Sequence, residues 1–70
     1  MKTCPRCRQS GLHRVAITTL DDWPVHLCQE CDALWDTPGE ITDENAFVDF
    51  SDFMEERELA GVWWQVKILD

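Results

Sequence analysis

Four cysteines are the residues of this chain whose type and spacing could do chemistry. They form two Cys-x2-Cys pairs, Cys4 with Cys7 and Cys28 with Cys31, and twenty residues separate the pairs. Two thiolates two residues apart can bind one ion from a tight turn whose backbone N–H groups point at the sulfurs. A hairpin that brings two such turns, called knuckles below, together would create one closed tetrahedral site. The spacing therefore predicts four thiolate ligands for one metal ion, and zinc is the expected metal.

A metal site would also supply stability that a chain of this size lacks. Its 70 residues make one small domain, and the hydrophobic core of such a domain alone supplies about 3–5 kcal/mol. Structural zinc contributes roughly 10–16 kcal/mol of apparent binding free energy in zinc-finger peptides. The sequence shows no apolar signal peptide and no apolar run near the roughly 20 residues of a membrane span. We therefore expect a cytoplasmic protein with reduced thiols and no membrane contact.

The residues between the two cysteine pairs predict a β-hairpin. Residues 12–20 and 25–27 are rich in strand-forming side chains, and residues 21–24 supply Asp and Pro for a turn. A thiol pair is expected at the start of each arm. We assign residues 1–41 to this hairpin segment.

Residues 42–61 predict an acidic helical segment. Phe47, Phe50 and Met54 are three and four residues apart, which is the spacing of one helix face, and acidic residues cover the other face. Thr42 or Asp43 is the expected N-cap, and Gly61 would end the helix. Because Asp52 and Glu55 also resemble a capping box, a break with a second helix starting near Ser51 is an alternative.

Residues 62–70 predict a final strand that adds to the hairpin sheet or closes the core. In VWWQVKIL, Trp64, Val66 and Ile68 alternate with Trp63, Gln65 and Lys67. The three segments together predict one α+β domain, a small zinc-ribbon β-hairpin with a C-terminal helix and a final β-strand.

Residues around the cysteines form a further pattern. CPRC at 4–7, VHLCQECDALW at 25–35 and GE at 39–40 match, in order, Cys-Pro-x-Cys, a returning strand with Cys-x-x-Cys and Trp, and Gly-Glu. Over about residues 4–41 this pattern resembles the transcription factor IIB-type zinc ribbons found in many small bacterial proteins. The resemblance implies zinc at the four cysteines. Asp32 and Ala33 replace the family's paired glycines, and Arg8 stands where a glycine often follows the first knuckle. These departures put the knuckle geometry in question but not the ligand set.

Other uses of the cysteines fit the sequence less well. DDWPVHLCQEC resembles the second knuckle of rubredoxins, which are iron electron carriers, but the loop between the knuckles is too short and the usual aromatic residue after the first knuckle is absent. A thioredoxin-type redox pair belongs to a longer βαβ fold. His13 and His26 could replace a ligand, but four cysteines already complete the set. Four thiolates leave zinc no open position for substrate, so we expect a structural ion and no enzyme activity.

The charge is distributed unevenly along the chain. The net charge is −8, yet residues 1–20 hold four basic residues and no acidic one, while residues 21–70 hold all fourteen acidic residues and two basic ones. Phosphate contacts supply most non-specific nucleic-acid affinity, so an acidic chain is better suited to a basic protein surface. We therefore expect a regulatory or protein–protein interaction module that docks a basic protein. A nucleic-acid-binding zinc ribbon is the alternative.

Candidate binding residues follow from this division. An acidic face on the helical segment, with an exposed tryptophan as a hot spot, would bind the protein partner. Its residues are Asp43, Glu44, Asp49, Asp52, Glu55, Glu56, Glu58 and Trp63. The nucleic-acid alternative would use Arg6, Arg8 and Arg14. The competing explanation for Arg6 and Arg8 is that they offset the negative charge of zinc with four thiolates.

Two further tryptophans have structural expectations. Trp35 is expected to pack over the second knuckle and shield it from water, and Trp23, in the hairpin turn, is expected to be partly exposed.

Overall fold

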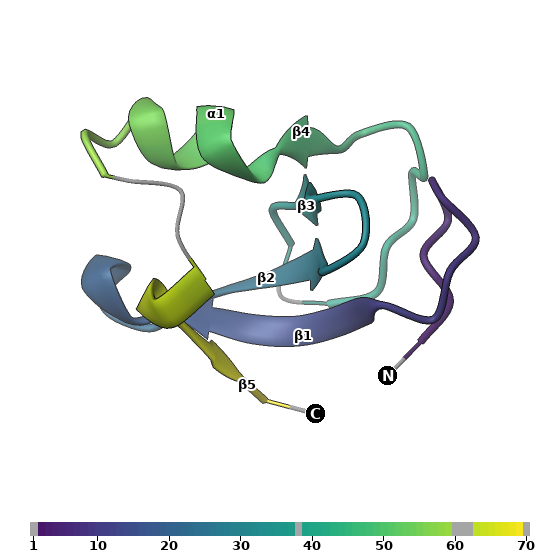
Figure 1. The fold of residues 1–70 in the computed structure, drawn as a ribbon, viewed down its shortest axis with the longest axis horizontal. Coiled ribbons are helices and arrows are strands. Elements are labelled where there is room, and N and C mark those ends of the chain that lie inside the picture. Colours follow the sequence, from purple (N-terminus) through teal and green to yellow (C-terminus); the bar gives the residue numbers. More distant parts are fainter. Residues whose placement is uncertain (1, 38, 60–62, 70) are drawn as a thin grey trace.

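The computed structural model describes residues 2–37, 39–59 and 63–69. In these residues an antiparallel sheet of five strands, in the order β4-β3-β2-β1-β5, accompanies one short α-helix (Figure 1). The elements are β1 (Leu12–Ile17), η1 (Thr18–Leu20), β2 (Trp23–Cys28), β3 (Ala33–Trp35), β4 (Val48–Asp49), α1 (Phe50–Glu55), η2 (Trp63–Gln65) and β5 (Val66–Ile68), where η marks a 3-10 helix. The expected α+β class is confirmed. No helix in these residues is long and apolar enough to cross a membrane.

The predicted hairpin is formed by β1 and β2. Its register pairs Leu12 with Cys28 and Ile17 with Trp23. The chain reverses through η1 and through Asp21 and Asp22, which both have positive φ angles of 54° and 58°. Both cysteine pairs lie at the same end of this hairpin, but they do not each begin an arm. The first pair precedes β1, whereas Cys28 is the last residue of β2.

The predicted helix over residues 42–61 is mostly wrong, because α1 is far shorter and begins later. Asp49 is its N-cap, and the Asp49 Oδ1 atom accepts a hydrogen bond of 2.9 Å from the Ser51 N–H. Asp43 makes the same kind of bond to the Asn45 N–H at 3.0 Å, but no helix follows it. The physical reason is Val48, which pairs with β3 and so holds the backbone extended up to the residue before α1. The alternative start near Ser51 is close to the observed one.

The predicted C-terminal strand is confirmed only over β5. It pairs antiparallel with β1, with Ile68 opposite Val15 and Val66 opposite Ile17, so it extends the hairpin sheet as expected. The preceding residues form the 3-10 turn η2 instead, and the Thr18 hydroxyl donates a 2.9 Å hydrogen bond to the Gln65 carbonyl at its end. The expected helix stop at Gly61 lies outside the described residues.

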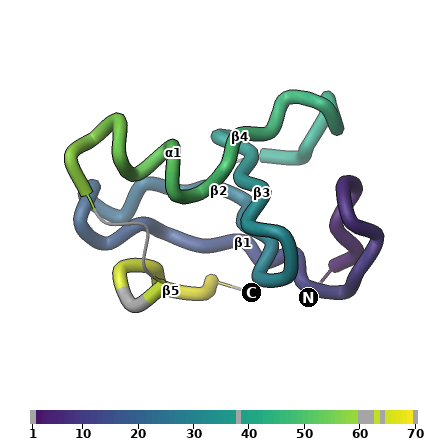
Figure 2. Tube along the Cα trace, turned by 45° about the horizontal axis from the view of Figure 1, so that its top comes forward, coloured from purple at the N-terminus to yellow at the C-terminus, as the bar shows by residue number. Residues whose placement is uncertain are grey.

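Alternate residues of each strand point to opposite sides of the sheet, and a cluster of buried residues lies on each side. On one side, the helix face, strand residues pack against α1, which runs alongside β1 and β2 in Figures 1 and 2. The buried residues of the helix face are Val15, Ile17, Val25, Leu27, Leu34, Phe50, Phe53 and Met54. On the other side, the cysteine face, the buried cluster is Cys4, Leu12, Cys28, Ala33 and Trp35.

Candidate metal centre

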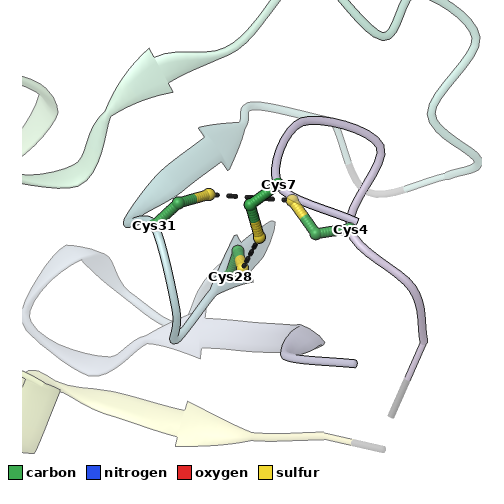
Figure 3. A group of neighbouring side chains, drawn as sticks. All are labelled: Cys4, Cys7, Cys28 and Cys31. Atoms are coloured by element: carbon green, nitrogen blue, oxygen red, sulfur yellow. Dashed lines mark hydrogen bonds between the residues drawn. The ribbon is translucent and has the colours of Figure 1, made fainter. Parts of the chain in front are cut away.

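The sulfurs of the four predicted ligands lie together at one end of the hairpin (Figure 3). All four are within 4.8 Å of one another, and the Sγ–Sγ distances are 3.7 Å for Cys4 and Cys31 and 3.6 Å for Cys7 and Cys28. An ion bound tetrahedrally at the zinc–sulfur distance of about 2.3 Å would place its sulfurs about 3.8 Å apart. None of the four cysteines forms a disulfide bond. The set of side chains therefore fits one tetrahedral metal ion.

The two knuckles have the same backbone turn. The Arg8 N–H donates to the Cys4 carbonyl at 2.9 Å, and the Asp32 N–H donates to the Cys28 carbonyl at 3.0 Å. Arg8 and Asp32 also share a left-handed conformation, with φ angles of 66° and 58°. The two turns are therefore alike although neither position is a glycine. Asp adopts this conformation readily, whereas for most residues it costs roughly 1–2 kcal/mol.

The protein environment shifts the pKa values of three of the thiols, but not all in the same direction. Burial raises the pKa of Cys28 to about 12, although the Glu30 N–H lies 3.4 Å from its sulfur, and burial also raises the pKa of Cys31. Burial opposes ionisation of Cys4 as well, but backbone N–H groups of Cys7 and Arg6 at its sulfur lower its pKa. Thiolate is the form that binds metal, so a bound cation must displace protons from Cys28 and Cys31.

The site is shielded by an aromatic pair on the cysteine face. Cys4 and Cys28 have no exposed surface, and Trp35 packs in the same cluster with 2% of its surface exposed. Phe47 covers the edge of this cluster, with its ring centroid 5.7 Å from that of Trp35. The expectation that Trp35 packs beside the second knuckle as a buried residue is confirmed.

Arg6 connects the two knuckles, a role that the sequence did not predict. Its Nη1 atom donates a 3.3 Å hydrogen bond to the Cys31 carbonyl. Its guanidinium also lies over the Phe47 ring, 4.6 Å from the centroid. Arg6 thus joins the first knuckle, the second knuckle and the segment before β4. We expected Phe47 on a helical stripe, and no local pattern indicated this contact. Arg8 and Arg14, the other two candidate arginines, have exposed side chains.

The two histidines are buried strand residues, and neither belongs to the sulfur cluster. His26 Nε2 hydrogen-bonds to the Gly39 carbonyl at 2.5 Å, and His13 Nε2 lies 3.3 Å from Gln29 Oε1. The prediction that His26 is a strand residue is confirmed.

The candidate partner-binding residues are only partly brought together. Asp49, Asp52 and Glu56 line a groove of about 380 Å³ between β4 and α1. Glu55 and Glu58 are exposed but do not line it, and Trp63 is half-buried with its ring 6.0 Å from that of Phe50. The full lining, called the acidic groove below, is Asp36, Val48, Asp49, Asp52, Phe53, Glu56 and Arg57.

Sequence reasoning missed the residues that complete this groove. Asp36 follows β3 and accepts a 2.7 Å hydrogen bond from the Nε1–H of Trp23, which is 43% exposed as expected. Val48 is 45% exposed. A hydrogen bond between residues thirteen apart leaves no periodic signal in a sequence, so no local pattern could have found it.

Comparison with known proteins gave no match: no family model, no curated protein and no solved structure is significantly similar to this chain.

Proposed function

We propose that Cys4, Cys7, Cys28 and Cys31 bind one structural zinc ion in a zinc-ribbon domain, and that the domain docks a basic protein on its acidic surface. The observation that carries this proposal is the separation of two sites. The four sulfurs are packed against Trp35 at one end of the hairpin, whereas the acidic groove is open to solvent beside α1. A closed four-thiolate site, with two cysteines buried and two half-buried, is suited to holding a fold together, and binding then falls to the surface.

The sulfur geometry supports a four-coordinate ion, and the donor set supports zinc or iron. The chain sets both knuckle turns, directs backbone N–H groups at the sulfurs of Cys4 and Cys28, and places the Arg6 guanidinium at the Cys31 carbonyl. When bound, zinc would link the knuckles without redox chemistry. Metal analysis of the purified protein should give one zinc per chain and no visible absorption. A coloured protein with one iron per chain would instead support a rubredoxin-like site.

The charge distribution supports a basic protein as the partner. Reversing Asp52, Glu55 and Glu56 to lysine should abolish recovery of protein partners in affinity capture from cells. Reversing Glu30 and Glu40 to lysine, at exposed positions outside α1, serves as the control and should leave recovery largely unchanged. Equal recovery by the wild type and the acid-reversed protein would contradict the proposal.

Nucleic-acid binding receives less support from the contacts. Arg6, one of its three candidate residues, is already held by the Cys31 carbonyl and the Phe47 ring. Binding of DNA or RNA at low salt that is lost when Arg8 and Arg14 are replaced would favour this alternative.

A further inference from the structure

We infer that the acidic groove receives one lysine or arginine side chain from an extended segment of the partner protein, with an apolar neighbour of that side chain resting on Val48. This inference rests on the proposed function, since it names the place and the chemistry of docking. It narrows the acidic surface to one groove and includes residues that lie outside the helical segment.

The groove is lined by both apolar side chains and carboxylates. Val48 and Phe53 supply apolar surface from β4 and α1. Asp52 lies in the first turn of α1, and Glu56 is its C-cap residue. Because they are four residues apart, their side chains are neighbours on one side of the helix. An incoming side chain with a long apolar stem and a cationic tip matches both features, because lysine and arginine bury their stems while their charge stays near water.

The carboxylates of the groove differ in what already occupies them. Asp36 accepts from the Trp23 indole, and Asp49 caps α1 through the Ser51 N–H. Over the described part of the chain, no hydrogen bond or ion pair reaches the carboxylate of Asp52. Among the described residues, the carboxylate of Glu56 has Arg57 as its one charged partner, at 3.7 Å, and its side chain is 77% exposed. Asp52 and Glu56 are therefore the groups available to a partner's cation.

Arg57, the cation of the groove's own lining, lies 3.7 Å from Glu56 and offsets only part of the charge of the four carboxylates. Its Nη1 atom donates to the Phe53 carbonyl at 2.9 Å, and its guanidinium lies 3.7 Å from the Phe53 ring centroid. The same guanidinium lies 5.9 Å from the exposed Trp23 ring. These contacts hold the Arg57 side chain in place, and the exposed Trp23 ring beside it is an aromatic side chain of the kind that recurs at binding hot spots.

Charge complementarity identifies the occupant. The groove presents four carboxylates against one fixed guanidinium, in a chain whose net charge is −8. Such a surface repels phosphate backbones and attracts basic segments. A basic peptide of a protein partner is therefore the occupant that the groove favours.

The test is a titration of the metal-loaded full chain with a capped hexapeptide of alternating arginine and leucine, followed by amide and indole NMR shifts. We expect shifts at Val48, Asp52, Glu56 and the Trp23 indole. The double variant Asp52→Asn with Glu56→Gln should weaken peptide affinity about tenfold, as loss of two exposed ion pairs implies.

The matched control is Glu30→Gln with Glu40→Gln, which removes the same charge at exposed positions outside the groove and should change affinity by less than about twofold. Equal weakening by both double variants, or peptide shifts that avoid the groove, would overturn the inference while partner capture could still support the proposed function. Concentration-dependent shifts at the groove without peptide would identify a second copy of the chain as the occupant and would also overturn it. A capped glutamate–leucine hexapeptide should cause no shifts, and equal binding of it would likewise contradict charge recognition.

Discussion

The two faces of the sheet bury different kinds of side chain. The helix face consists of apolar side chains that β1, β2 and β3 pack against α1. In the cysteine face, two of the five buried residues are candidate metal ligands, and the other two ligands, Cys7 and Cys31, lie half-buried at its edge. One face can thus be held by apolar packing alone, whereas the other encloses a group of thiols that a metal would have to join. Stability should therefore depend on metal at one face and on side-chain volume at the other.

Removal of the metal should have the largest effect. Chelation, or Cys28→Ser, is expected to unfold the domain, because the roughly 10–16 kcal/mol of apparent zinc affinity exceeds the stability of so small a core. Far-ultraviolet circular dichroism with and without added zinc would measure this. Ser10→Ala, at an exposed position near the first knuckle, is the control and should keep both metal and structure. A metal-free protein with a native spectrum would show that the helix face alone sustains the fold.

Truncation of one phenylalanine on each face should have the next largest effect on the free energy of unfolding. Phe50 is 1% exposed on the helix face, so Phe50→Ala should lower the free energy of unfolding of the zinc-loaded protein by about 3–5 kcal/mol. Phe47 is half-buried at the cysteine face, so Phe47→Ala should cost about half as much. Urea unfolding of both variants would measure the difference. A larger loss for Phe47→Ala would reverse the assignment of the stronger apolar packing to the helix face.

Arginine truncation in the first knuckle should have a smaller effect and tests whether Arg6 acts through its contacts. Arg6→Ala removes the bond to the Cys31 carbonyl and the Phe47 stack, and should lower the free energy of unfolding by about 1–2 kcal/mol. Arg8→Ala removes an equal charge from an exposed side chain and should cost almost nothing. Chemical unfolding and the rate of zinc loss to a chelator are the measurements. Equal losses would mean that both arginines act only by offsetting thiolate charge.

Glycine substitution at the ends of the knuckles should have the smallest effect on stability. It tests whether the left-handed conformation costs more at Arg8 than at Asp32. Arg8→Gly is expected to stabilise the zinc-loaded protein by about 1 kcal/mol, because it relieves a left-handed conformation at φ 66°. Asp32→Gly should gain less, since aspartate tolerates its φ of 58°. Midpoints of thermal unfolding would rank the variants. A greater gain at Asp32 would contradict this account of the backbone.

The parts that local spacing determines were predictable from the sequence. Four cysteines at ligand spacing and a run of strand-forming residues between the pairs indicated the sulfur cluster and the β1–β2 hairpin. Where two sites had equal local chemistry, tertiary pairing decided between them. Asp43 and Asp49 both accept a backbone N–H two residues ahead, but only Asp49 begins a helix, because Val48 beside it is held in the sheet by Leu34.

The candidate docking surface was the least predictable part. The acidic segment was visible in the charge pattern, but its division into groove-lining and outlying residues was not. Asp36 reaches the groove because β3 pairs with β2, and neither β3 nor β4 was predicted, since each is short and depends on a neighbouring strand. Trp63 fits the same rule: its contact with Phe50 comes from the packing of α1 and not from strand alternation.

The strand order also implies a sequence of events during folding. The β1–β2 hairpin joins residues close in the chain, and hairpins of this kind form in about 1–10 μs. Formation of this hairpin places Cys28 near the first knuckle before any distant segment has to arrive. By contrast, β5 must close a loop of about fifty residues to pair Ile68 with Val15, at a greater entropic cost. We therefore expect metal capture to follow the hairpin, and β5 to be the last strand to join the sheet.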